Sequence, residues 1–204
     1  MSLLNKLKIV AGMKGEKRDE VGEYTHCEVL KGDSIDVVFA KTLVHNNGNF
    51  FYCDKKEDLI KTIQALTKKL NTNLIYCIEP ILQELLSKSL INYENDDYLN
   101  CDAFLSSCEY LIAHHGKIML SSKQLGANNI KNLPQEHIVV AYTSQIVKNL
   151  NDGMSGINTR YVDNLPSTIT TITSNQPVEK NIVEGNIKNL SVLLIEDYQE
   201  KGER

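Results

Sequence analysis

Two adjacent histidines, followed by a glycine and a lysine, are the residues of this sequence whose types and spacing most suggest chemistry. They are His114, His115, Gly116 and Lys117, and apolar runs lie on both sides of them. Imidazole binds metals and exchanges protons near neutral pH, and a histidine beside a lysine can bind a carboxylate or a phosphate. The segment therefore has three interpretations: a metal site, an anion site or a polar corner of the chain.

The metal interpretation is the weakest of the three. Neighbouring residues in an extended strand point to opposite faces, so His114 and His115 cannot easily hold one ion, and no nearby H-x-H or carboxylate motif completes a site. In the corner interpretation, Gly116 supplies a positive φ and one histidine points inward. One of the two histidines also forms a hydrogen bond with the backbone. In the anion interpretation, an inward histidine acts together with Lys117.

Ser144 and Gln145 are further candidates for ligand binding. With Thr143 they follow the buried run "HIVVAY", at a point where a strand ends and a helix is expected. Such a point is the usual ligand crevice of open α/β sheets. A plain N-cap accounts for Ser144 equally well.

Other polar side chains have weaker claims to catalysis. Ser121 and Ser122 lack a G-x-S-x-G motif, so capping or strand-end hydrogen bonding is favoured over a nucleophilic role. Glu109 lies inside an apolar run and would be a base of raised pKa if it were buried, although a strand glutamate more often faces outward. His137 begins a strand after Pro134, and we expect it to be structural.

Composition and charge exclude several classes of function. The 204 residues are 42% hydrophobic and 24% charged, as in an ordinary folded protein. The net charge is -4 and the lysines form no stripe, which argues against nucleic acid as a partner. No apolar run approaches the roughly 18 residues of a membrane span. The five cysteines are scattered without a C-x-x-C pair. We therefore expect reduced thiols in a cytoplasmic protein, with no metal and no cofactor.

In the first half, helical and strand patterns alternate. "DSIDVVFAKTLVHNN" is a predicted helix capped by Asp33 or Ser34, and "NFFYC" is a short strand. Asp54 and Glu57 have the spacing of a capping box before "KKEDLIKTIQALTKKL". "NLIYCI" is the next strand, and Pro80 suits the first turn of another helix. Such alternation predicts right-handed crossovers and a parallel sheet.

In the second half, extended runs dominate. "FLSSCEYLIA" and "KIMLSS" are predicted to join at the histidine pair as a hairpin or tight corner. "HIVVAYT", "TITTITS" and "LSVLLIED" are further strands, and helical turns are expected after Ser144 and Asp152. The predicted fold is α/β, with one open mixed sheet, largely parallel, flanked by helices. We expect a single domain from residue 24 to 198, between a flexible or loosely docked tail at 1–23 and a short tail at 199–204.

Four linked segments carry a resemblance to a known family. "SCEYLIAHHGKIMLSS", "LPQEHIVVAYTSQIV", "LPSTITTIT" and "LSVLLIED" occur in an order and spacing that resemble the LUD domain, the small lactate-utilisation family. The resemblance implies a fold like that of the sugar-phosphate isomerases and CoA transferases. It also implies a bacterial, cytoplasmic role near lactate oxidation, where members work beside iron–sulfur oxidoreductase subunits.

The sequence departs from the family pattern at its polar motifs. Where the family has alanine, glutamate, threonine and glycine, this chain has Ala113, His114, His115 and Gly116. Where the family has a glycine-proline-serine turn that presents hydrogen-bond donors to an anion, this chain has Ser174 and then Asn, Gln and Pro. The histidine-glycine-proline corner of the family is also absent. Loss of a carboxylate and gain of Lys117 make the region more positive, which favours an anionic ligand over proton abstraction. Ser174 stands where the family has its anion-binding turn, and it stays a candidate beside the histidine pair.

Two functions from different classes follow. The first is an accessory protein of lactate or organic-acid utilisation that binds a small carboxylate or phosphate and has little or no catalysis of its own. The alternative is an enzyme that acts on a small acyl or phosphorylated metabolite through His114, His115 and Lys117.

Overall fold

The computed structural model describes residues 29–174 and 186–196. Its helices are α2 (Ile35–His45), α3 (Lys56–Leu70), α4 (Pro80–Lys88), α5 (Ser122–Leu125) and α6 (Leu150–Arg160), with the 3-10 turns η1 (Ala113–His115) and η2 (Thr143–Gln145). Its strands are β1 (Asn49–Cys53), β2 (Ile75–Tyr76), β3 (Tyr93–Glu94), β4 (Ala103–Ser106), β5 (Tyr110–Ile112), β6 (Lys117–Ser121), β7 (Glu136–Tyr142), β8 (Ile146–Val147), β9 (Ile169–Thr173), β10 (Asn186–Ile187) and β11 (Asn189–Ile195). The predicted tails at 1–23 and 199–204 lie outside the described residues.

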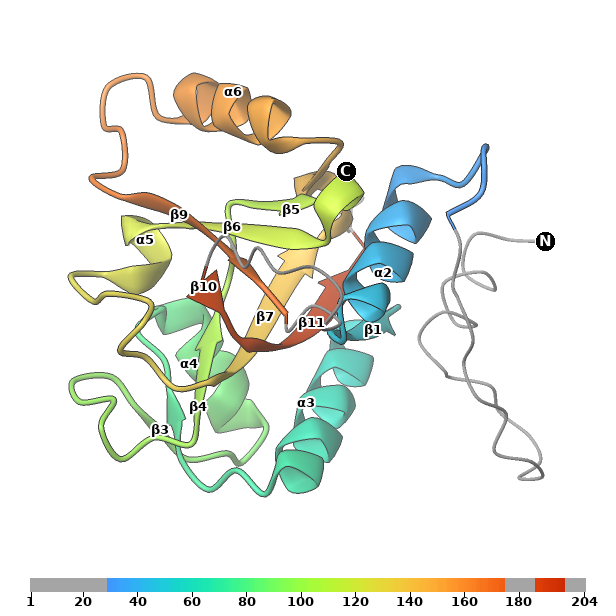
Figure 1. Cartoon of the computed structure of the whole chain (residues 1–204). Coiled ribbons are helices and arrows are strands. Elements are labelled where there is room, and N and C mark those ends of the chain that lie inside the picture. Colours follow the sequence, from blue (N-terminus) through green and yellow to red (C-terminus); the bar gives the residue numbers. More distant parts are fainter. Residues whose placement is uncertain (1–28, 175–185, 197–204) are drawn as a thin grey trace, which may run out of the picture.

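The described strands form two sheets (Figure 1). One sheet has six parallel strands in the order β1-β11-β7-β4-β2-β3. The other has five strands in the order β10-β9-β6-β5-β8, with β6 antiparallel to both of its neighbours. β11 is buried from Leu190 to Ile195 because it lies between β1 and β7 with both faces covered.

Each face of the six-stranded sheet packs against a different layer. On one face, α3 and α4 bury leucine and isoleucine side chains such as Leu59, Ile63 and Leu86 against the strands. On the other face, α2 and the five-stranded sheet complete a core that includes Phe39, Phe104 and Ile118. Figure 1 shows α6 along the outer side of the five-stranded sheet.

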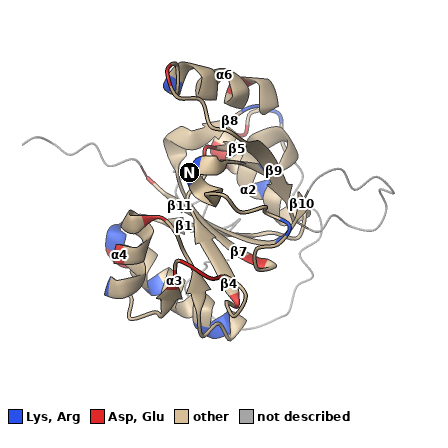
Figure 2. Cartoon of the chain, turned by 90° about the vertical axis from the view of Figure 1, so that its left-hand side faces the viewer, with Lys and Arg blue, Asp and Glu red and all other residues tan. Residues whose placement is uncertain are grey.

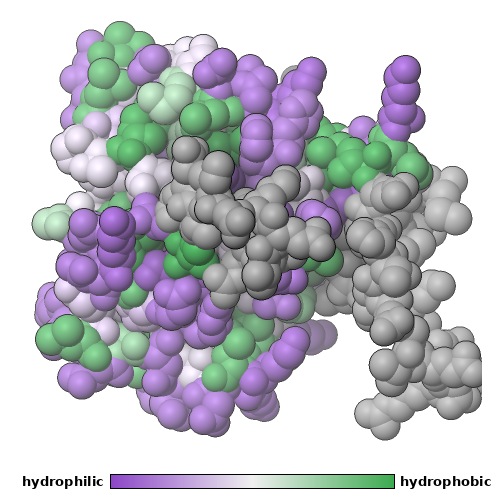
Figure 3. Space-filling view, in the orientation of Figure 1, coloured by the Kyte–Doolittle hydropathy of each residue, from purple (hydrophilic) through white to green (hydrophobic). Residues whose placement is uncertain are grey.

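Two glycines let α6 approach the five-stranded sheet closely. A Cβ on Gly153 would lie 2.9 Å from the Met119 methyl group, and one on Gly156 would lie 2.2 Å from the Tyr110 hydroxyl. Leu150 and Met154 of α6 remain exposed at the surface. Figure 3 shows apolar side chains gathered there and before α2.

The predicted α/β class, with a largely parallel sheet flanked by helices, is confirmed. The expectation of one sheet is wrong, because the predicted run "FLSSCEYLIA" is two strands, β4 and β5, that belong to different sheets. The chain leaves the six-stranded sheet at Ser107 and enters the other sheet at Tyr110. The predicted antiparallel joining of β5 to β6 is confirmed.

Three predictions of local structure are wrong. The expected capping box at Asp54 is replaced by an N-cap at Lys55 without a side-chain hydrogen bond. The expected helical turn after Ser144 is the 3-10 turn η2 followed by β8. The last helix is capped by the side chain of Asn149, which accepts a hydrogen bond from the backbone N–H of Asp152 at 3.0 Å, and not by Asp152 itself.

Candidate functional site

Polar side chains meet where β2 and β4 end, at the carboxyl edge of the parallel sheet. Glu79 follows β2, and Ser107 and Glu109 follow β4. Because β2 and β4 are neighbouring parallel strands, the segments that follow them leave the sheet on the same side. This edge is where open α/β folds usually bind ligands.

Glu79 is engaged by Ser107. Its carboxylate accepts hydrogen bonds from the backbone N–H of Ser107 at 2.7 Å and from the Ser107 hydroxyl. Burial raises the pKa of the Glu79 carboxyl group, and the two bonds from Ser107 oppose that rise. Glu79 therefore holds the exit of β4 against the exit of β2.

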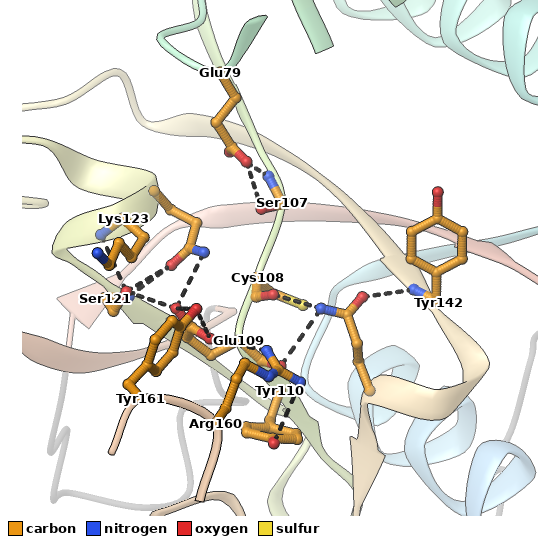
Figure 4. Close-up of polar contacts among 12 residues, drawn as sticks. Glu79, Ser107, Cys108, Glu109, Tyr110, Ser121, Lys123, Tyr142, Arg160 and Tyr161 are labelled. Carbon is orange, nitrogen blue, oxygen red and sulfur yellow. Dashed lines mark hydrogen bonds and ion pairs between the residues drawn. The ribbon is translucent and has the colours of Figure 1, made fainter. Parts of the chain in front are cut away.

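Glu109 accepts hydrogen bonds from four side chains (Figure 4). The Ser121 hydroxyl lies 2.6 Å from Oε1, and the Gln124 amide nitrogen lies 3.2 Å from the same oxygen. Arg160 Nη1 lies 3.1 Å from Oε2, and the Tyr161 hydroxyl is within 3.2 Å of both oxygens. The Glu109 side chain is only 1% exposed, so these contacts replace water around the carboxylate.

Local structure positions these four side chains. Ser121 and Gln124 form the capping box of α5, in which the Ser121 backbone N–H donates to the Gln124 carbonyl at 2.8 Å. Arg160 ends α6, and Tyr161 is the residue that follows it. Glu109 thus connects α5 and α6 to the start of β5.

The outer side of this network carries positive charge and aromatic rings. The Arg160 guanidinium lies 5.0 Å from the centre of the Tyr110 ring and donates to the Tyr110 hydroxyl at 3.3 Å. The Lys123 ammonium lies 5.6 Å from the centre of the Tyr161 ring. The Arg160 side chain is 43% exposed, so solvent reaches the cation although it does not reach Glu109.

The network leaves little capacity for acid–base chemistry at Glu109. An ionised carboxylate offers about four lone-pair positions, and the contacts with Ser121, Gln124, Arg160 and Tyr161 occupy that number. A general base needs a free position within reach of a substrate proton. The arrangement is that of a buried ion pair joining secondary-structure elements. The prediction that a strand glutamate here would face outward is wrong.

A serine and a histidine also meet in the core. Ser106 Oγ lies 2.8 Å from His137 Nε2, and both residues are completely buried. The His137 ring lies 4.5 Å from the Phe104 ring, and its Nδ1 has no hydrogen-bond partner among the described residues. Burial, with a smaller contribution from Lys188, lowers the pKa of His137 to about 3. This placement fits the structural role expected for His137, because no solvent reaches the pair.

The histidine pair forms a corner that packs on α2. Gly116 has φ +57°, and a Cβ on it would lie 2.9 Å from the backbone nitrogen of Leu43. The Asn46 side chain donates to the His115 carbonyl at 2.9 Å, and the His114 backbone N–H donates to the Lys148 carbonyl at 3.2 Å.

The side chains of this corner face solvent. His114 and His115 are both exposed, so the expectation that one would point inward is wrong. Lys117 is half-buried at the start of β6. Within the described part of the chain, no group of three His, Cys, Asp or Glu residues could hold a metal ion.

Two of the other predicted site residues, Gln145 and Ser144, lie apart from this corner. Gln145 accepts from the Tyr142 backbone N–H at 2.8 Å and donates to the Cys108 carbonyl, near the start of β5, whereas the corner follows its end. Ser144 beside it is exposed. Ser174 is buried after β9, and its hydroxyl lies 2.7 Å from the position that a Cβ on Gly48 would take. The structure thus leaves Ser144 and Gln145 away from the corner. Ser174 follows β9, which pairs with β6 so that Ile172 faces Ile118, and it therefore lies near the start of β6 beside the corner.

Sequence reasoning missed Glu79, Ser107, Arg160 and Tyr161. Glu79 could have been noted because it follows the predicted strand "NLIYCI", at a place where ligand crevices form. Ser107 lies inside the run that was predicted as one strand. Arg160 and Tyr161 lie at the end of a helix about 50 residues after Glu109, and no spacing along the chain indicates that contact.

Comparison with known proteins identifies the family of this fold. The LUD domain family model matches residues 37–195. The crystal structure of a DUF162 family protein from Deinococcus radiodurans is similar, with a TM-score of 0.61 and 17% sequence identity over 80% of this chain and 96% of that chain. At this identity the likeness concerns the fold. Among curated proteins, none matches the sequence.

Proposed function

The chain belongs to the LUD domain family, and from this premise we propose that it is an accessory protein of organic-acid utilisation that binds a small anion with little or no catalysis of its own. Membership of this lactate-utilisation family supports a function related to lactate use. None of the described helices has the length and apolar character to cross a membrane. The family resemblance also leads us to propose a bacterial, cytoplasmic setting and an iron–sulfur oxidoreductase subunit as partner.

The state of the carboxylates of Glu79 and Glu109 is the observation that carries this proposal. Glu79 and Glu109 lie at the edge of the sheet where a catalytic base would be expected, and protein donors engage both of them. A substrate would have to displace Arg160 and Tyr161 before Glu109 could accept its proton. Binding without proton transfer requires no such rearrangement.

The proposed anion site is the corner of His114, His115 and Lys117. The three side chains follow one another around Gly116, and among the described residues none makes a hydrogen bond or an ion pair through its side chain. Their N–H groups are therefore available to a carboxylate or a phosphate. Ser144 and Gln145 lie towards the other end of β5 and Ser174 is buried, so the proposed contacts are those of the corner alone.

The alternative is an enzyme that uses the same corner on a small acyl or phosphorylated metabolite. Both functions predict binding there, but only the enzyme predicts turnover that depends on it. Isothermal titration of the full chain with lactate, pyruvate, acetyl-CoA and glucose 6-phosphate, followed by NMR of each mixture, measures both properties.

We expect one of these anions to bind and to remain unchanged over hours. Lys117→Ala and the double variant His114→Ala, His115→Ala should each weaken binding about fivefold or more, as loss of a charged hydrogen bond would. Lys61→Ala is the matched control for Lys117→Ala, because Lys61 is an exposed lysine on α3, which packs on the other face of the six-stranded sheet. Turnover that the corner variants abolish would establish the enzyme instead. Equal affinity in all variants would reject the corner as the site.

A further inference from the structure

A second concave site lies between α3 and α4, away from the histidine corner. Its volume is about 210 Å³, and it opens beside the carboxyl ends of β7 and β11. Its lining residues are Lys56, Leu59, Ile81, Leu82, Glu84, Leu85, Lys88, Val140, Tyr142 and Ile195. We call it the α3–α4 groove. The groove lies at the carboxyl edge of the parallel sheet, where open α/β folds usually bind ligands.

The α3–α4 groove is apolar inside and at its mouth. Leu59, Val140 and Ile195 are at most 6% exposed and form its buried wall. Ile81 is 82% exposed and Tyr142 is 47% exposed, although both line the groove. Burying these two side chains against a ligand would remove apolar surface from water, which favours an apolar ligand.

The charged side chains of the groove leave one positive charge uncompensated. Lys88 pairs with Glu84 one helical turn away on α4. Lys56 begins α3 and lines the groove together with Glu84 and Lys88 of α4. Among the described residues Lys56 forms no ion pair. Figure 2 shows charges of both signs along α4.

We propose that the α3–α4 groove binds a short aliphatic carboxylate, with its hydrocarbon chain between Leu59, Ile81 and Val140 and its carboxylate beside Lys56. The volume of about 210 Å³ has room for a chain of a few carbons. This site is independent of the anion site at His114, His115 and Lys117, since it differs in place and in chemistry.

The length of the hydrocarbon chain provides the first test. The full chain is titrated calorimetrically with propanoate, butanoate, pentanoate and hexanoate at one ionic strength. Each added CH₂ should lower Kd about fourfold, the ratio that ~0.8 kcal/mol gives at 25 °C, until the groove is full. Hexan-1-ol tests the carboxylate, and lactate, titrated into the Lys117→Ala variant so that the histidine corner does not contribute, tests the need for a chain; both should bind at least fivefold more weakly than hexanoate.

Variants of exposed side chains test where the ligand binds and should leave the fold intact. Lys56→Glu should weaken hexanoate binding about fivefold or more, and Ile81→Gln should weaken it by a similar factor. Lys61→Glu is the matched control, because it reverses a charge on α3 outside the lining and should leave Kd unchanged. Lys117→Ala should also leave hexanoate binding unchanged, which separates this proposal from the anion site.

Three results would overturn the proposal. One is the absence of hexanoate binding at millimolar concentration. Another is hexanoate binding that Lys56→Glu and Ile81→Gln do not alter. The third is sedimentation showing a dimer that Ile81→Gln dissociates, because the groove would then be a contact between two copies. None of these results bears on binding of lactate or phosphate at the histidine corner.

Discussion

Replacing Arg160 by methionine tests whether the Glu109 network is a structural connection. Removing one partner of a fully buried pair costs about 3–5 kcal/mol, because the other charge stays buried without compensation. Here Arg160 is 43% exposed and Ser121, Gln124 and Tyr161 still donate to Glu109, so the loss should be smaller. Arg160→Met also removes the contact of the guanidinium with the Tyr110 ring, which contributes ~0.5 kcal/mol. For the ion pair and this contact together, we expect the free energy of unfolding to decrease by about 2 kcal/mol.

Replacing Glu109 itself should cost more. Glu109→Gln keeps the shape but turns one acceptor oxygen into an NH₂ group that faces existing donors. An unsatisfied buried group costs about 1–3 kcal/mol, and two donors lose their acceptor, so we expect about 3 kcal/mol. Because Arg160 and Glu109 contact each other, the double variant should lose about 1 kcal/mol less than the sum of the single losses.

Urea denaturation at pH 7 followed by circular dichroism measures these free energies, provided that the m-values stay constant. Lys123→Met is the matched control, since it removes a cation beside Tyr161 that does not touch Glu109, and should cost less than about 1 kcal/mol. A change below 0.5 kcal/mol in Arg160→Met, together with additive single losses, would refute the structural interpretation of the network.

Three further predictions concern burial and backbone geometry. Burial holds the pKa of His137 at about 3 in the folded protein, whereas the unfolded chain takes up the proton near pH 6.5, so stability should decrease as the pH falls from 6.5 towards 3, by up to about 5 kcal/mol. The free energy of unfolding, measured by urea titration, should differ less between pH 7 and pH 5 in His137→Phe than in His45→Phe. Equal differences in the two variants would contradict this prediction. Gly116→Ala should lower the free energy of unfolding by about 2 kcal/mol or more, because it strains a positive φ and presses on α2, and a thermal melt within 2 °C of the parent would argue against that packing. Gly156→Ala should displace α6 from Tyr110 and increase amide hydrogen exchange in α6, whereas unchanged exchange there would show that the contact adapts.

Periodicity in the sequence predicted the elements whose stability is mostly local or whose apolar pattern is long. The stripe of Leu59, Ile63 and Leu66 identified α3, and the continuous apolar run of β11 identified a strand, which the structure places between β1 and β7. Such apolar patterns indicate which face of an element is buried, and this face is the same whichever neighbouring element packs against it.

The prediction was wrong where contacts distant in sequence decide the local structure. After Ser144 the sequence suits a helical cap, but the Gln145 side chain bonds to the Cys108 carbonyl and the chain continues as β8 beside β5. At Glu109 the pattern suits an outward strand residue. Arg160 and Tyr161 nevertheless approach from α6 and make its burial favourable.

The sequence by itself determined the α/β class, the family resemblance and the corner at His114, His115 and Gly116, because apolar periodicity and turn chemistry are local properties. Only the tertiary structure decided that the strands divide into two sheets, that both histidines face solvent and that Glu109 is enclosed by donors from α5 and α6. It also created the α3–α4 groove, whose walls come from segments more than 100 residues apart. These features depend on which surfaces of the chain pack together, and the spacing of residues along the sequence does not indicate which surfaces those are.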